Sequence, residues 1–298
     1  MRHLIVEILA FLAYWSGVDA IFYRLNRRAK RIVTFHNVLP DEIYKNDLAN
    51  GVSNSESGFR LIVGEIARKY RFSTDVWDPK TCTITFDDGY VNQVEVAGRV
   101  LGEMGIPAIL FVAGDLIGGK GPLLVDRLLH ETESVSEWTS SVWPGFKDGK
   151  VEVKGGGGQW IEKLPSEYRR LRLTGVAEAQ LADLRTKGWK IGWHTWRHLP
   201  LVSLSEDELR KELDCPAEFR GEVLSYPFGN PEEVGEAAIR IAEELGYPCA
   251  VSNTHAAGAK HGRYFLPRMD LQPDKYMIHF ELSGAKFWMK TRMLLPHV

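Results

Sequence analysis

Two adjacent carboxylates, Asp87 and Asp88, follow a run of β-branched and aromatic residues over 81–86 in this chain of 298 residues. Such a run is typical of a strand, and Gly89 after the carboxylates permits a sharp exit from it. Neighbouring negative charges repel each other, so a cation beside them would offset that cost. The pair therefore indicates either joint metal binding or a division in which one carboxylate binds metal and the other acts as a base.

A pair of histidines could complete a metal site. His194 and His198 are spaced so that they can face the same way on one helical turn or meet in a compact loop. With one carboxylate they provide three ligands and leave positions open for water, and this donor set favours zinc. Taken alone, such a histidine pair is more often structural, and an Asp-Asp-Gly turn is more often a solvated loop. The prediction therefore depends on the combination.

The elements that must position these residues alternate between strand and helix patterns. Strands are expected over 31–35, 81–86, 107–113, 189–193, 223–226 and 249–251, and helices over 59–70, 91–104, 176–187 and 231–245. This order is typical of parallel βαβ units, and we expect one α/β barrel-like domain. Such barrels hold their chemistry at the carboxyl ends of the strands. Five candidate residues come directly after an expected strand: His36, Asp87, Asp88, His194 and Phe228.

The segments 85–89 and 194–198 together resemble the first two motifs of the polysaccharide deacetylases (carbohydrate esterase family 4, the chitooligosaccharide deacetylase homology domain). The resemblance extends over about residues 31–271. It implies a distorted (β/α) barrel of about seven parallel strands and metal-dependent hydrolysis of acetyl groups. By the match, Asp88, His194 and His198 would hold a divalent metal, zinc by expectation, and Asp87 would be the general base.

The segment 225–229 resembles the third motif of the family in its Tyr-Pro-Phe-Gly form. Because Pro227 has no N–H, Phe228 supplies the first backbone donor after it and is the candidate for stabilising an oxyanion. The sequence departs from the common pattern at Ser225, where most members carry arginine. A simple turn is the alternative interpretation of this segment.

The general acid has two candidates. The C-terminal Leu-x-His motif is not clearly present, and the flanks of His279 match it poorly. His36 matches the upstream position used in a branch similar to the poly-N-acetylglucosamine deacetylases, so we expect His36 to be the acid; a buried structural histidine is the alternative. Arg268 looks like the fourth motif and would hold Asp87 by a bidentate pair. The alternative for Arg268 is an ordinary surface arginine.

The resemblance implies removal of acetyl groups, N-acetyl in preference to O-acetyl, from an amino-sugar-containing glycan or glycolipid. Two other functions stay open: a catalytically idle carbohydrate-binding barrel, and a metal-dependent amidase acting on a non-sugar amide. The presence of both carboxylates and both histidines disfavours the idle barrel.

Residues 1–30 precede the expected catalytic domain, 31–298, in which 131–170 forms an excursion from the core. The apolar run over 4–23 is interrupted by Glu7 and Asp19, and its longest uncharged stretch, 8–18, is shorter than the roughly 20 residues of a membrane span. A basic cluster follows: Arg24, Arg27, Arg28, Lys30 and Arg31. We expect an amphipathic helix with a basic end, which either contacts an anionic membrane or packs on the domain. A signal peptide is less favoured.

Composition excludes some partners. The net charge of -2 offers no electrostatic basis for binding nucleic acid. The three cysteines, Cys82, Cys215 and Cys249, are odd in number and widely spaced, which disfavours a disulfide framework or a thiolate zinc site. A cytoplasmic location, with contact to the membrane, is favoured over a secreted or cell-envelope one. Nothing in the sequence indicates an oligomeric state.

Overall fold

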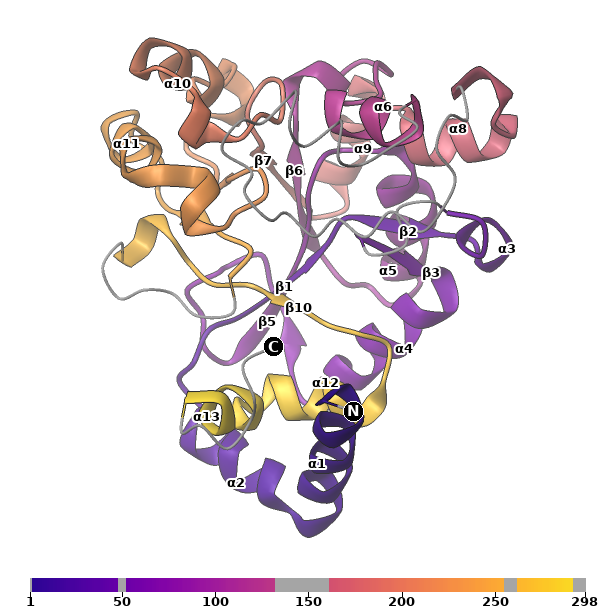
Figure 1. Ribbon diagram of the computed structural model, residues 1–298, viewed down its shortest axis with the longest axis vertical. Helices are drawn as coiled ribbons and strands as arrows, with labels where there is room; N and C mark the ends of the chain where they lie inside the picture. Colours follow the sequence, from indigo (N-terminus) through magenta and orange to yellow (C-terminus); the bar gives the residue numbers. More distant parts are fainter. Residues whose placement is uncertain (1, 48–51, 132–160, 255–261, 292–298) are drawn as a thin grey trace.

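Parallel strands form the centre of the protein, which a computed structural model describes over residues 2–47, 52–131, 161–254 and 262–291 (Figure 1). The longer strands are continuous β-branched and apolar runs with both faces buried, as parallel sheets require. The strands are β1 Arg31–Phe35, β2 Asn37–Leu39, β3 Ser53–Ser55, β4 Arg71–Phe72, β5 Thr81–Phe86, β6 Ala108–Val112, β7 Lys190–Trp193, β8 Leu224–Ser225, β9 Ala250–Val251 and β10 Met269–Asp270.

The main sheet runs in the order β10-β1-β5-β6-β7-β8-β9, with β4 paired to the start of β5. Every pair in it is parallel. A single bridge between Val251 and Leu266 joins β9 to the segment just before β10, so the two edges of the sheet approach each other. The sheet is therefore a curled, distorted (β/α) barrel in a single domain, and the predicted fold is confirmed. The short strands β2 and β3 form a separate parallel pair.

Helices surround the outer face of the sheet (Figure 1). The main core lies between them, and within it Trp189 stacks on Phe86 with ring centroids 5.6 Å apart. The helices are α1 Arg2–Ser16, α2 Val18–Leu25, α3 Asp41–Tyr44, α4 Glu56–Ala67, α5 Gly98–Glu103, α6 Leu124–Glu131, α8 Ser166–Leu173, α9 Glu178–Thr186, α10 Glu206–Leu213, α11 Pro231–Glu244, α12 Lys275–Leu282 and α13 Ala285–Thr291. A π-helical turn, Gln93–Ala97, leads into α5.

The inner face of the sheet carries a smaller apolar cluster, which includes Ile32, Ile109, Phe111 and Val223. These residues alternate along the strands with members of the main core. The interior is packed so closely at Gly192 that glycine is required there, because a Cβ would lie 2.4 Å from the Val223 carbonyl oxygen and 2.6 Å from the Phe111 ring. Every second residue of a strand faces this interior. Toward the carboxyl ends of the strands, the residues at these inward-facing positions are polar.

The segment 1–30 is predicted as one amphipathic helix, but its described part contains two helices, α1 and α2, with a break at Gly17, whose φ is 79°. Among the described residues no single helix is long and apolar enough to cross a membrane. The segments 4–16 and 18–25 are long and apolar enough only when they are taken together, and the angle between them is 83°. One side of α1 packs on α12 through Val6, Ala10 and Phe280. Of the predicted excursion over 131–170, residues 132–160 lie outside the described part of the chain, and its end forms part of α8.

Candidate active site

The carboxyl ends of β1, β5, β7 and β8 bring most of the predicted residues together. His36 follows β1, Asp87 and Asp88 follow β5, and His194 follows β7. Because the strands are parallel, these ends meet at one edge of the sheet. Ser225 ends β8 and leads into the turn that contains Phe228, and Arg268 lies directly before β10.

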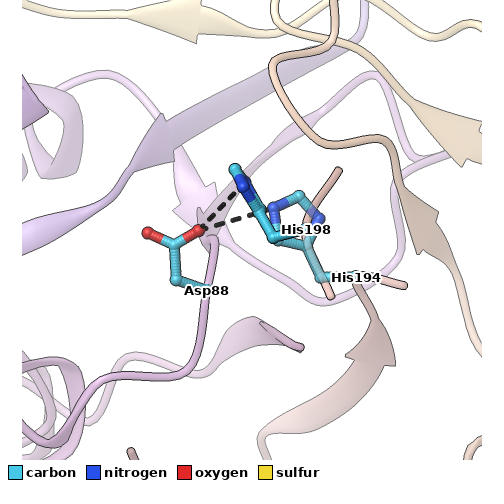
Figure 2. Close-up of side chains that lie close together, drawn as sticks. All are labelled: Asp88, His194 and His198. Carbon is cyan, nitrogen blue, oxygen red and sulfur yellow. Dashed lines mark ion pairs between the residues drawn. The ribbon is translucent and has the colours of Figure 1, made fainter. Parts of the chain in front are cut away.

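Asp88, His194 and His198 form a buried group in which one ligand atom from each residue lies within 4.8 Å of the others. Figure 2 shows both imidazoles directed at one carboxylate oxygen: the Asp88 Oδ1 atom is 3.6 Å from His194 Nε2 and 3.4 Å from His198 Nε2. Asp88 Oδ1 and His194 Nε2 are buried without a hydrogen-bond partner. Two ligands each about 2.1 Å from one tetrahedral ion lie roughly 3.4 Å apart. The residues therefore fit a divalent metal.

The orientation of the His194 ring is fixed by a contact with Ser225, which lies outside the group of Asp88, His194 and His198. Its Nδ1 atom lies 2.8 Å from the Ser225 carbonyl oxygen, which assigns the proton to Nδ1 and leaves the Nε2 lone pair facing Asp88. Burial lowers the pKa of His198 to about 4, so this imidazole is neutral at neutral pH. Burial raises the pKa of Asp88, but its contacts with the imidazoles of His194 and His198 outweigh burial, and the net pKa lies well below the usual value. Asp88 and His198 are thus in the protonation state that metal ligands need. Burial lowers the pKa of His194, but the charges of Asp87 and Asp88 outweigh burial and raise it above its usual value.

Asp87 is held apart from this group by Arg268. The guanidinium donates from Nη1 to Asp87 Oδ1 at 2.7 Å and from Nη2 to Oδ2 at 2.5 Å, and Ser225 Oγ donates to Oδ1 at 3.1 Å. Asp87 and Arg268 are both almost completely buried. Burial raises the pKa of Asp87, but Arg268, together with the nearby His194 and His36, outweighs burial and brings it to about 2. The carboxylate is therefore ionised at neutral pH.

The two histidines considered as acid lie in different parts of the molecule. His36 Nε2 is 3.8 Å from Asp87 Oδ2, and the His36 side chain is 24% exposed. His279 lies on α12, where Nδ1 contacts the Tyr23 hydroxyl at 3.0 Å and Nε2 contacts Glu65 Oε2 at 3.0 Å. Figure 1 shows α12 at the bottom, at the amino-terminal end of the sheet. The structure thus places His36 at the site and His279 in a structural network away from it.

Phe228 lies beside the metal-ligand group. Its ring centroid is 4.9 Å from that of His198, and its φ is 60°. The turn continues through Gly229 with a φ of 70°, where a Cβ would lie 2.4 Å from the Asn253 nitrogen, so glycine is required there. The left-handed conformations of Phe228 and Gly229 thus direct this loop along the edge of the site.

Two buried residues that the sequence did not single out hold the loops of the site. Glu212 on α10 accepts from the Trp196 and Arg197 backbone N–H groups at 3.0 and 2.9 Å, and its own carbonyl accepts from Trp193 Nε1 at 3.1 Å. Its signal in the sequence is an acidic residue on the apolar side of an amphipathic helix. Gln93, in the π-helical turn, donates to the carbonyls of Asp87 and His36 and accepts from Gly89 N–H at 3.0 Å. π-Helical turns of this kind are frequent at functional sites.

Fold and site together define an α/β barrel protein with a candidate hydrolytic centre at the carboxyl ends of its strands. The profile of the polysaccharide deacetylase family matches residues 75–250, which is more than half of the chain. The chain therefore belongs to the polysaccharide deacetylase family, the carbohydrate deacetylases.

Similar solved structures share the fold. The Streptococcus pyogenes deacetylase PplD in complex with acetate is 17% identical, with a TM-score of 0.52 over 82% of this chain and 93% of that one. IcaB from Ammonifex degensii is 16% identical, with a TM-score of 0.52 over 86% and 97% of the two chains. The polysaccharide deacetylase BC0361 from Bacillus cereus is 15% identical, with a TM-score of 0.51 over 85% and 68%. Comparison with curated protein sequences found no match.

Proposed function

We propose that the protein removes acetyl groups, N-acetyl in preference to O-acetyl, from an amino-sugar-containing glycan or glycolipid in a metal-dependent hydrolysis. The observation that carries this proposal is the placement of Asp88 Oδ1, 3.6 Å from His194 Nε2 and 3.4 Å from His198 Nε2, next to a second carboxylate that is held separately. One carboxylate is thus available to a metal, and the other remains available to a proton.

A divalent metal, zinc by the preference of two imidazoles and one carboxylate, would be held by Asp88, His194 and His198, where it would polarise the acetyl carbonyl and lower the pKa of a water from about 15.7 toward about 7. Asp87 then receives the proton of the attacking water. A carboxylate with a pKa of about 2 is a weak acceptor in isolation. The transfer becomes favourable as the water oxygen loses electron density to the carbonyl carbon.

His36 donates a proton to the departing amine. An amine leaves from the tetrahedral centre only when it is protonated, so an amide substrate needs an acid at this place. The 3.8 Å separation between His36 Nε2 and Asp87 Oδ2 allows the proton to return from Asp87 to His36 after product leaves, which closes the cycle. Phe228 N–H is the backbone donor proposed to stabilise the oxyanion.

The test is acetate release from N-acetylglucosamine oligomers by the zinc-loaded protein and by the same protein treated with a chelator. We expect release that the chelator abolishes and added zinc restores. Release only from acetylated non-sugar amides would replace the proposal with an amidase. No release from a panel of N-acetylated and O-acetylated sugars, with metal bound, would point to an idle carbohydrate-binding barrel.

A further inference from the structure

One side of α1 exposes a stripe of large apolar side chains. Their spacing follows the helical period, and each is between 44% and 66% exposed: Leu4, Ile5, Ile8, Phe11, Leu12 and Trp15. The opposite side of the same helix is buried against α12 through Val6, Ala10 and Ala13. The domain therefore covers only one side of a helix that is apolar on both. Soluble proteins rarely leave so many neighbouring apolar side chains uncovered.

The stripe continues onto α2, where it meets positive charge. Ile21 and Leu25 are 57% and 71% exposed, and Arg24 lies on the same exposed side of this helix. Three further exposed basic residues follow directly: Arg27, Arg28 and Lys30. We call the apolar residues of α1 and α2 together with these basic residues the N-terminal face. Of the two acidic residues in these helices, Asp19 is buried and Glu7 is exposed.

We propose that the N-terminal face docks on an anionic membrane surface. An apolar stripe bordered by cations matches the acyl boundary and the negative headgroups of such a surface, with tryptophan suited to the region between them. A twofold contact between copies of this chain is less suitable, because it would bring two basic clusters into one interface with little acidic charge to match them. The packed inner side of α1 and the 83° bend at Gly17 make the contact peripheral.

The docked protein presents the candidate active site away from the bilayer. Arg31, at the start of β1, donates from Nε to the Leu282 carbonyl of α12 at 3.1 Å, whereas His36 follows the end of the same strand. The N-terminal face and the site thus lie toward opposite ends of the sheet (Figure 1). This step rests on the proposed function: it assigns as substrate a glycan that stands clear of the membrane, not a sugar at the headgroup level of the same bilayer.

The first experiment is co-sedimentation with phosphatidylcholine vesicles that contain or lack phosphatidylglycerol. We expect the wild type to bind the anionic vesicles and to dissociate as salt is raised. Replacing Leu4, Leu12 and Trp15 together by serine should weaken binding more than tenfold. Arg24→Gln with Arg28→Gln should weaken it roughly 25-fold, since each basic residue near an anionic surface contributes about fivefold.

Matched control variants distinguish binding through the N-terminal face from nonspecific hydrophobic or electrostatic binding. Serine at Met104, Val202 and Leu245, which are 42%, 57% and 37% exposed elsewhere on the molecule, should leave binding unchanged. Lys120→Gln with Lys163→Gln removes the same charge as the arginine pair and should also have no effect. Every variant should keep the wild-type melting temperature. Acetate release from a soluble oligomer is measured in parallel, so a failure of docking and a failure of the proposed function remain distinguishable.

Two outcomes would overturn the docking proposal: a wild type that binds neither vesicle, or serine variants that bind as tightly as the wild type. A wild-type dimer that the serine substitutions convert to monomer, without vesicle binding, would assign the face to a second copy. The orientation is tested by attaching a polarity-sensitive label to a cysteine introduced by Ser16→Cys or by Val202→Cys. The native cysteines are buried, so the label reacts with the introduced one. Only the label at residue 16 should respond to vesicles; a response at residue 202 alone would overturn the orientation.

Discussion

The buried ion pair between Asp87 and Arg268 should couple strongly in the stability of the metal-free protein. The net pKa of Asp87 is about 2, against an ordinary value of 3.8, even though burial acts in the opposite direction. That difference corresponds to about 2 kcal/mol. Breaking a buried pair by removing one partner generally costs about 3–5 kcal/mol, because the other charge is left buried and unpaired. We therefore expect a coupling free energy of at least about 2 kcal/mol.

The measurement is a double-mutant cycle with Asp87→Asn, Arg268→Gln and the double variant, by urea unfolding at pH 7 in the presence of a chelator. The cycle is needed because Arg268 also donates to the Ser252 carbonyl at 2.8 Å and to Thr85 Oγ1 at 3.1 Å. The exposed pair Arg170–Glu167 is the control and should show almost no coupling. A coupling below roughly 0.5 kcal/mol for the buried pair would refute the assignment of Arg268 as the group that keeps Asp87 ionised.

Three further predictions follow from the same contacts. His194→Ala should lose bound zinc, whereas Asp87→Asn should keep it and lose at least a hundredfold in turnover; equal metal content in the two variants would contradict the division of roles. His36→Ala should slow acetate release from an amide at least tenfold more than His279→Ala, and the reverse order would move the acid to α12. Burial raises the pKa of Asp19 to about 6 from 3.8. The unfolded state therefore loses its proton first, and wild-type stability should fall as pH rises from about 4 to about 6. Asp19→Asn should then be more stable than wild type by about 2–3 kcal/mol at pH 7.5 and show little gain at pH 4, as measured by urea unfolding.

The strands that carry the site were predictable because their burial is complete. Runs of β-branched, apolar and aromatic residues mark β1, β5 and β6, and the structure ends these strands within one residue of the prediction. Strands such as β3 and β10 carry no such pattern. Ser53–Ser55 is polar throughout, and Met269–Asp270 is held by register with Val33 and Thr34, not by its own composition. Pairing partners distant in sequence decide these short strands, so local pattern does not reveal them.

The grouping of candidate residues was predictable where strand ends converge. Asp87, Asp88, His36 and His194 each follow a strand, and parallel neighbours bring such positions to one edge. Glu212 was not predictable in the same way. Its carboxylate acts on the Trp196 and Arg197 backbone, and a side chain that bonds backbone leaves no motif of paired residue types.

Several residues of the site have strained backbone conformations, and contacts from neighbouring side chains hold them there. In the described part of the chain the non-glycine residues with positive φ are Asp88, Thr195, His198 and Phe228, at 82°, 63°, 55° and 60°. Aspartate tolerates this region, but β-branched threonine does not, and such residues cost on the order of 1–3 kcal/mol each. A chain with a typical stability of about 5–15 kcal/mol keeps them only where surrounding contacts impose them. Glu212 does so for the histidine loop by accepting two consecutive N–H groups, and Thr195 Oγ1 adds a contact to the His198 N–H at 3.3 Å. The fold of a parallel barrel does not require strain at these four positions. Asp88 and His198 belong to the candidate metal site, and Thr195 and Phe228 lie in the loops beside it, so the strain is concentrated where the proposed chemistry needs an imposed geometry.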